Sequence, residues 1–249
     1  MSKADQYREA LRAGTDWDGY LLEHSGLPGP RANLELAHAV ALEGDAPLFR
    51  RYLAFGADCA PTNTPQVFLA VCGVLGLGRL LSEGETEHLP ELRQLASDPR
   101  WRIREAVAMA LQSWGDSDMA GLLDAMDSWS QGNPLEQRAA AAALAEPRLL
   151  TGAGHARRVL DILDSITGSL AAQPDRSSEA FRVLRQGLGY CWSVAVVALP
   201  AVGTRMMERW FQSQDPDVRW IMRENLTKKR LYRMDPDWVR QWQAALEAA

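Results

Sequence analysis

The feature that most constrains the fold is a short sequence pattern that occurs three times. Residues 98–111 and 215–226 each begin with Asp-Pro, continue to an aliphatic residue followed directly by Arg, and end in an apolar run. A third copy, residues 133–144, begins with Asn-Pro and keeps the arginine, but has Gln137 in the aliphatic position. Repetition of this kind predicts an array of similar structural units rather than an irregular globule.

The spacing of the pattern is regular. Its arginines lie 34 residues apart in two successive pairs: Arg104 and Arg138, then Arg185 and Arg219. The interval from the first pair to the second is 47 residues. The longer interval predicts longer helices in the apolar segments 154–172 and 177–199.

Hydrophobic periodicity gives the fold class. Apolar residues recur at helical spacing almost everywhere, and no alternating run bounded by turns indicates a strand. Clusters of glycine, proline and small polar residues divide the chain into segments of mostly 10 to 20 residues. The sequence therefore predicts an all-α fold built from antiparallel helix pairs.

Several of these breaks have Asp or Asn directly before a proline. The side-chain oxygen of such a residue can accept from free backbone N–H groups, and proline suits the first turn of a helix. We therefore expect four helix N-caps: Asp98, Asn133, Asp215 and Asp235.

The repeated pattern resembles the HEAT-repeat family, whose units place Asp in a turn and Val-Arg early in the second helix. The resemblance covers about residues 98–144 and 215–227, and before residue 84 only the spacing of helix pairs supports it. It implies one domain, 1–249, forming a right-handed α-α superhelix (a solenoid) whose inner helices line a concave face. It also implies a ladder of hydrogen bonds between units, made by four residues: Asp98, Arg104, Asp215 and Arg219.

A stack of helix pairs needs a polar cap at each end, because the outermost pair has no neighbour on one side. Residues 1–30 and 228–249 are the expected caps. In the first, four residues are expected to face inward: Tyr7, Leu11, Trp17 and Leu21. In the second, an aromatic stripe is expected to dock on the last repeat: Trp238, Trp242 and Leu246.

Composition narrows the class of protein. The longest apolar stretches are shorter than the roughly 20 residues of a membrane-spanning helix and contain Gly or Pro, and the charged N-terminus does not resemble a signal peptide. We expect no membrane partner and a cytoplasmic protein. The three cysteines, Cys59, Cys72 and Cys191, are an odd number in apolar surroundings and are expected to be reduced core thiols.

Charge is unevenly distributed along the chain. The net charge is −5, but residues 1–130 hold 11 basic and 19 acidic residues, whereas residues 131–249 hold 16 basic and 13 acidic residues. The basic C-terminal half is therefore the part that could meet a nucleic acid.

No sequence motif indicates catalysis, a cofactor or a metal. The glycines at 73, 76 and 78 lie in an apolar helical pattern without a phosphate-binding signature, so they are expected to let two helices approach closely. The four histidines are isolated from one another and from cysteine. Asp161 and Asp164 share a helical face, but two acids on a solvated face are ordinary. Cys191 lacks a nearby histidine and is expected to be buried.

Binding residues are predicted where arginine and tryptophan occur on inner helices. Arginine can pair with anionic groups, and exposed aromatic rings can stack on a base or anchor a protein partner. The candidates are Arg104, Arg138, Arg185, Trp192, Arg219, Trp220 and Arg223. Some of the residues around 182–192 must be core, because they cannot share one face of a helix.

Two functions follow. The first is a non-enzymatic scaffold that presents a concave surface to a protein or peptide partner. The alternative rests on resemblance to the HEAT-like alkylpurine DNA glycosylases, which hold damaged DNA on a basic concave face with tryptophans, a carboxylate and an arginine. No catalytic Asp of this chain matches that family's pattern, so catalysis is not expected in the first case and stays open in the second.

Overall fold

The computed structural model describes residues 2–14 and 16–248, and every regular element in these ranges is a helix. The prediction of an all-α fold is therefore confirmed. The helices gather in two compact units, Met1–Asp118 (unit 1) and Met119–Ala249 (unit 2). In the part of the chain that the structure describes, no helix is long and apolar enough to cross a bilayer.

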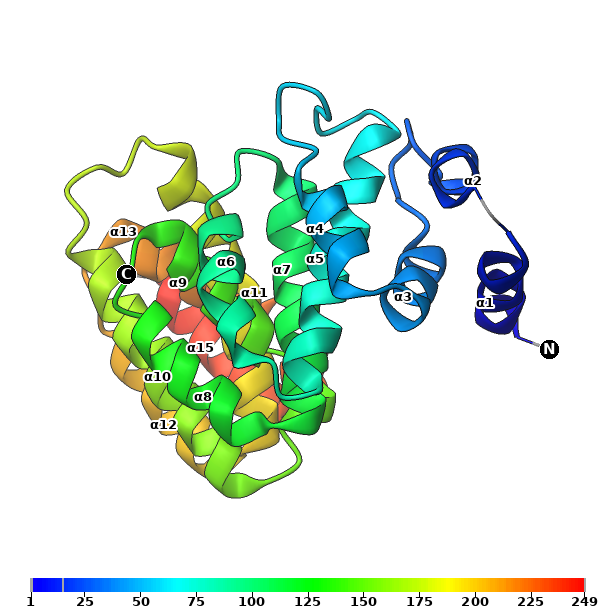
Figure 1. Ribbon diagram of the computed structural model, residues 1–249. Helices are drawn as coiled ribbons and strands as arrows, with labels where there is room; N and C mark the ends of the chain where they lie inside the picture. The colour runs from blue at the N-terminus through cyan, green and yellow to red at the C-terminus, as the bar shows by residue number, and fades with distance from the viewer. Residues whose placement is uncertain (1, 15, 249) are drawn as a thin grey trace. The chain divides into compact units, whose positions relative to one another are not determined.

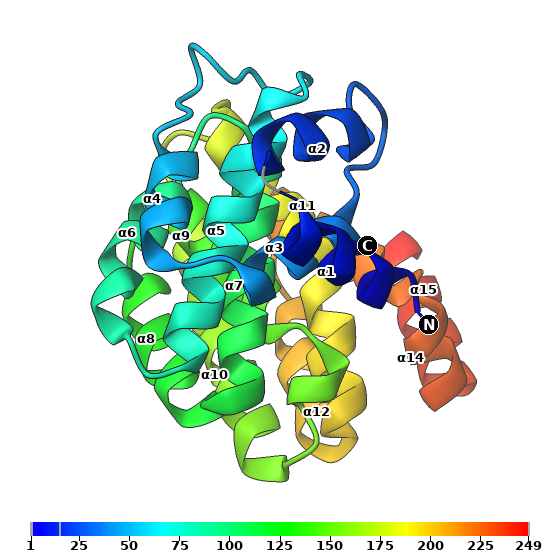
Figure 2. The same ribbon diagram turned by 45° about the vertical axis from the view of Figure 1, so that its right-hand side comes forward.

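Unit 1 consists of two rows of helices. The first row packs side by side in the order α1 (Lys3–Ala13), α3 (Leu34–Glu43), α5 (Gln66–Ser82) and α7 (Trp101–Ser117), as Figure 1 shows. Figure 2 gives a view of the same helices turned by 45°. Behind this row lie α2 (Trp17–His24) and α4 (Ala46–Leu53) on α5, and η1 (Thr86–His88) and α6 (Leu89–Leu95) beside α5 and α7. Consecutive helices thus alternate between the rows.

Close packing at the centre of unit 1 depends on glycines of α5. A Cβ atom at Gly76 would lie 2.3 Å from the ring of Phe49 in α4, and one at Gly78 would lie 2.6 Å from the Cα atom of Ala110 in α7. Both distances are too short for a real contact. The prediction that these small residues let helices approach closely is confirmed.

Unit 2 repeats the alternation of rows. One row consists of α9 (Pro134–Leu144), α11 (Glu179–Ala198), α13 (Pro216–Leu226) and α15 (Pro236–Ala248). The other contains α8 (Met119–Trp129), α10 (Ala153–Ala171) and α12 (Pro200–Phe211), which lie together in Figure 1. The short η2 (Pro147–Leu149) and α14 (Lys229–Met234) complete the unit. At 19 and 20 residues, α10 and α11 are the long helices that the 47-residue interval predicts.

Three of the four predicted N-caps are confirmed. Asn133 and Asp215 each accept from two backbone N–H groups at the start of α9 and α13, and Asp235 accepts from the N–H of Trp238 in α15. The prediction for Asp98 is wrong, because α7 begins only at Trp101 with Arg100 as its N-cap. The carboxylate of Asp98 instead accepts from the backbone and the guanidinium of Arg100.

The residues expected to face inward in the terminal segments differ in burial. In the N-terminal segment Leu11 and Leu21 are buried, whereas Tyr7 and Trp17 are half-buried. In the C-terminal segment the ring of Phe211 lies 5.8 Å from that of Trp238 and 4.6 Å from that of Trp242, measured between centroids, and Leu246 is buried.

The cysteines correct one expectation. All three are free thiols, and Cys72 and Cys191 are buried as predicted, but Cys59 is exposed. Cys59 lies in the irregular segment between α4 and α5, outside any helix.

Candidate functional site

An ion-pair cluster in unit 2 contains Arg185, one of the predicted binding residues. Arg176, which precedes α11, donates to Asp215 (2.6 Å), to Asp217 (3.0 Å) and to the carbonyl of Ala171 (2.7 Å). Nε of Arg185 lies 2.8 Å from Oδ1 of Asp217, at ion-pair distance but without the geometry of a hydrogen bond. These contacts tie the start of α11 to the start of α13.

The aromatic neighbour in this cluster is Trp220. The guanidinium carbon of Arg185 lies 3.8 Å from the centre of the Trp220 ring, which is a close cation–π contact. Both side chains are half-buried, and Arg138 on α9 is half-buried as well. Arg185 and Trp220 therefore contact one another within unit 2.

Arg219 and Arg223 have a different acceptor. Both donate through Nη2 to the backbone carbonyl of Leu246 in the last turn of α15, Arg219 at 3.5 Å and Arg223 at a shorter distance. The last carbonyls of a helix have no partner within the helix and attract positive charge. The two arginines therefore cap the C-terminus of α15.

The remaining predicted residues are in the core. Trp192 is fully buried, and its Nε1 donates to Oγ1 of Thr167 at 3.0 Å. Arg104 is only 6% exposed and donates to the carbonyls of Asp98 and Pro99 in unit 1. Trp192 has no ring surface for a ligand. Asp98 pairs with Arg100, and Asp215 pairs with Arg176.

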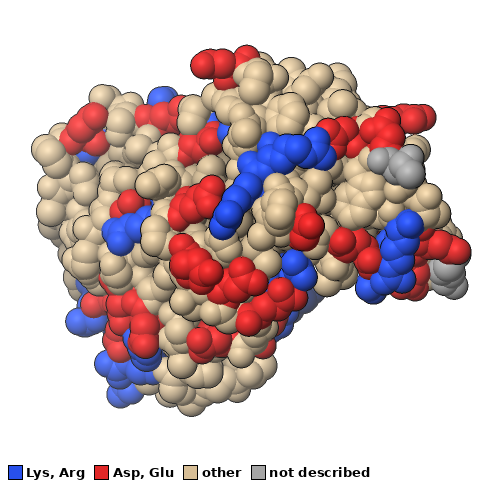
Figure 3. Space-filling model, in the orientation of Figure 1, with Lys and Arg blue, Asp and Glu red and all other residues tan. Residues whose placement is uncertain are grey.

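Charged side chains on α8 and α10 of unit 2 also form ion pairs with one another. Arg158 contacts Asp124 and Asp127, and Asp161 pairs with Arg157 on α10. On the face shown in Figure 3, basic side chains lie singly or in small groups among acidic ones. This face therefore lacks the continuous basic stripe that is typical of a nucleic-acid interface.

One hollow of unit 1 is lined by residues of several helices. A cavity of about 860 Å³ opens at the N-terminal ends of α1, α3 and α7, against the side of α5 and the segment before α3. Its apolar wall includes Leu34, Val71, Trp101 and Met109. The size and the mainly apolar wall with a few polar groups are typical of ligand-binding cavities.

Trp101, the first residue of α7, is 44% exposed in this cavity. The guanidinium carbon of Arg102 lies 4.3 Å from the centre of the Trp101 ring. Leu34, which is 41% exposed, lines the same cavity, so Trp101 is not a lone exposed apolar residue. Here the ring is held by its neighbour before any ligand arrives.

Arg102 is itself held in place. It is 6% exposed, its Nε donates to the carbonyl of Thr62 (2.9 Å), and its Nη2 donates to the carbonyl of Gly29 (2.7 Å). Burial lowers the pKa of the Arg102 guanidinium because desolvation disfavours the charged form. The arginine thus fixes two irregular segments and the ring of Trp101 relative to α7.

Charged side chains surround the opening of the cavity. Lys3 and Glu35 lie 3.7 Å apart, and both are exposed. Arg31 is exposed in the segment before α3, and Glu105 lies one helical turn after Trp101. The rim therefore offers both signs of charge around an apolar wall.

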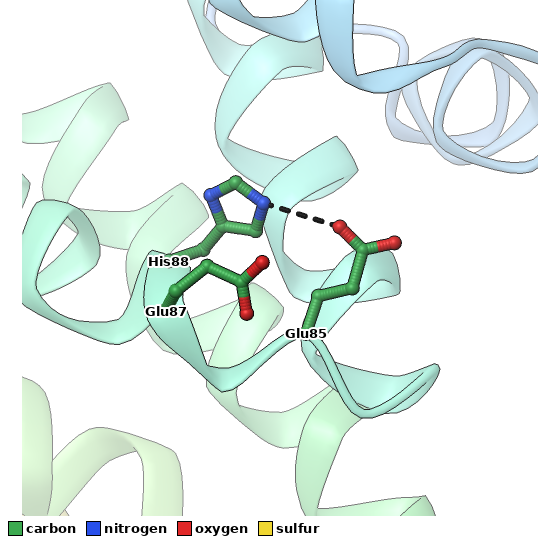
Figure 4. Close-up of side chains that lie close together, drawn as sticks. All are labelled: Glu85, Glu87 and His88. Atoms are coloured by element: carbon green, nitrogen blue, oxygen red, sulfur yellow. Dashed lines mark ion pairs between the residues drawn. The ribbon is translucent and has the colours of Figure 1, made fainter.

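A second cluster in unit 1 has the donor types of a metal site. Oxygen atoms of Glu85 and Glu87 and a nitrogen of His88 lie within 4.8 Å of one another, and the His88 Nε2 atom is 3.4 Å from Glu85 (Figure 4). The sequence does not predict a metal site here, because His88 has no nearby cysteine or histidine at a metal-ligand spacing. The three residues come from a single turn and both carboxylates reach solvent, so the arrangement is that of an ordinary local ion pair.

Comparison of the chain with family models finds no matching family, and neither a curated protein nor a solved structure matches it. What the cavity binds is therefore inferred from the residues that line it.

The sequence analysis did not single out Arg102. Arg100, Arg102 and Arg104 alternate in one short stretch, and no pattern in the sequence shows which of them faces a cavity.

Proposed function

We propose that this chain is a binding module of HEAT-type helical repeats, and that the cavity of unit 1 holds a side chain of a protein or peptide partner. The observation that carries the proposal is Trp101, an exposed ring fixed against a buried arginine in an apolar cavity. Tryptophan residues in preformed pockets dominate the binding energy of many protein interfaces.

The architecture supports this proposal. In each unit alternate helices form a row, and a row of helices offers an extended face on which a peptide can lie. The cavity is also preorganised, since the two carbonyl contacts of Arg102 hold its wall before binding. Preorganisation reduces the entropy that binding costs. The proposal needs no catalytic step.

A cytoplasmic location belongs to the same proposal. Three free cysteines, one of them exposed, suit a reducing compartment. Fractionation of cells that produce a tagged full-length chain would test it, and a tag recovered in an oxidising compartment would contradict it.

The test is selection from a phage-displayed library of random peptides against the full-length protein. We expect binding peptides rich in apolar residues, and we expect them to lose at least tenfold in affinity for a Trp101→Ala variant, because the loss of one central aromatic contact costs about 2 kcal/mol. The matched control is Tyr232→Ala, which removes an exposed ring in unit 2. Peptides that bind all three proteins equally would contradict the proposal.

One observation favours the second function, that of a DNA glycosylase. Trp101 and the carboxylate of Glu105 line the same cavity one helical turn apart, and an aromatic ring beside a carboxylate is suited to a flipped base. A duplex oligonucleotide containing an alkylated purine tests this function. Release of the free base, abolished by Glu105→Gln, would establish it, and no binding to the duplex at low salt would exclude it.

A further inference from the structure

Arg102 differs from Arg100, the buried residue that precedes α7, in what surrounds it. Arg100 is paired with the carboxylate of Asp98, whose Oδ2 lies 2.7 Å from its Nη2. Among the described residues, the partners of Arg102 are two backbone carbonyls and the ring of Trp101, and no carboxylate lies at ion-pair distance from it. Burying a positive charge without a counter-ion is costly. An anion in the cavity would remove that cost.

The arginine also retains a free donor. Its Nε and Nη2 atoms are used by Thr62 and Gly29, whereas Nη1 has no acceptor among the described residues. Nη1 is not one of the unpaired nitrogen atoms that are sealed from solvent, and Arg102 forms part of the cavity wall. The free N–H groups of this side chain are therefore available to a bound molecule.

The start of α7 adds donors at the same place. No side chain caps this helix, and its first intrahelical bond is made by the N–H of Ile103. The N–H groups of Trp101 and Arg102 at the exposed start of a 17-residue helix thus have no acceptor among the described residues. Free N–H groups and the helix dipole both favour an anion there.

We infer that the cavity of unit 1 binds a carboxylate of a peptide partner at Arg102, with an apolar side chain of the same peptide on the ring of Trp101. This inference rests on the proposed peptide-binding function and specifies the chemistry of the bound segment. A carboxylate fits better than a phosphate, because Glu35 and Glu105 also line the cavity and would repel a doubly charged group more strongly. The carboxylate can be a peptide C-terminus or an Asp or Glu side chain.

The test is calorimetric titration of the full-length protein with four small probes. N-acetyl-L-phenylalanine carries a terminal carboxylate, and N-acetyl-L-phenylalaninamide carries none. The α-amide of N-acetyl-L-phenylalanyl-L-aspartic acid carries only a side-chain carboxylate, and phenyl phosphate carries a phosphate. We expect one or both carboxylates to bind at least tenfold more tightly than the neutral amide, since a charge-assisted hydrogen bond contributes at least that factor. The tighter of the two acids identifies the source of the group.

Variants locate the effect. Arg102→Met should abolish the preference for the acids over the amide, whereas Trp101→Ala should weaken the binding of every probe and keep that preference. Arg50→Ala, at an exposed arginine of α4 outside the cavity, is the control and should change nothing. The comparison of acid with amide needs only the native protein. It therefore tests the preference for a carboxylate even where Arg102→Met fails to fold.

The outcomes separate the two claims. Equal affinity for acid and amide would overturn the carboxylate inference and leave the peptide-binding proposal standing. Absence of binding by every probe would contradict both. Tighter binding of phenyl phosphate than of either acid would overturn the assignment of a carboxylate.

Discussion

The two units use their arginines in different ways. In unit 2, Arg176 and Arg185 are paired with Asp215 and Asp217, so each of these two half-buried arginines has a counter-ion nearby. In unit 1, Arg102 is more deeply buried and has only carbonyls and an aromatic ring beside it, at the wall of a cavity. The comparison teaches that an arginine is available for binding when its neighbours do not neutralise its charge. A local excess of basic residues in the sequence does not by itself locate a binding site.

The largest expected effect on stability concerns the ion-pair cluster of unit 2. Asp215→Ala removes an N-cap and one partner of Arg176, and we expect the free energy of unfolding to fall by about 2 kcal/mol. Urea denaturation at neutral pH measures it. The control is Asp237→Ala, which removes an 89% exposed carboxylate from the first turn of α15 and should cost about 0.5 kcal/mol or less. Equal losses would mean that the cluster contributes little.

The pH dependence of the same variant sharpens the comparison. Burial opposes ionisation of Asp215, but Arg176 and the N–H groups of Val218 and Asp217 outweigh burial and lower the pKa of this carboxyl. A carboxylate with a lowered folded-state pKa stabilises the fold above its unfolded pKa of about 3.9, and this contribution is lost as the pH falls through the folded-state value. The stability difference between native protein and Asp215→Ala should therefore shrink on acidification below about pH 4. A difference that stays constant would contradict the ion-pair account.

A smaller effect is expected where arginine caps a helix. Arg223→Ala removes one of the two donors to the Leu246 carbonyl and should destabilise the protein by about 0.5–1 kcal/mol. Thermal unfolding measures it, with the exposed Arg233 as the control position. Affinity for duplex DNA should be the same for Arg223→Ala and the native protein. A steep loss of salt-dependent DNA binding would show that Arg223 serves nucleic acid instead.

The smallest change in stability is expected at the cavity. Trp101 is nearly half exposed, so Trp101→Ala should alter the free energy of unfolding by no more than about 0.5 kcal/mol, while peptide binding is lost. Parallel denaturation of Tyr232→Ala provides the comparison. A loss of several kcal/mol at Trp101 would indicate a structural role for the ring and weaken the binding proposal.

Much of the fold could be predicted from sequence because its signals are local. The apolar spacing and the breakers predict the helices, and Asn133 and Asp215 each cap the helix that directly follows them. The glycines of α5 could be interpreted in the same way. Glycine weakens a helix, so several glycines inside one apolar helix indicate that a neighbouring helix comes close.

The roles of the arginines could not be predicted, because their acceptors are set by tertiary structure. Arg104 donates to a carbonyl six residues earlier, whereas Arg219, at the same place in the repeated pattern, donates to one 27 residues later. The cavity wall combines residues from α1, α3, α5 and α7, which no spacing in the sequence brings together. Nor does the sequence distinguish a covered tryptophan such as Trp192 from an exposed one such as Trp101.

The most direct test of the account is a nuclear magnetic resonance titration that follows the indole N–H signals of ¹⁵N-labelled protein as N-acetyl-L-phenylalanine is added. The account predicts that the signal assigned to Trp101, by its disappearance in Trp101→Ala, shifts with the probe while the signal of buried Trp192 stays in place. A Trp101 signal that does not move at saturating probe, or shifts confined to Trp220 and Trp238 of unit 2, would contradict it.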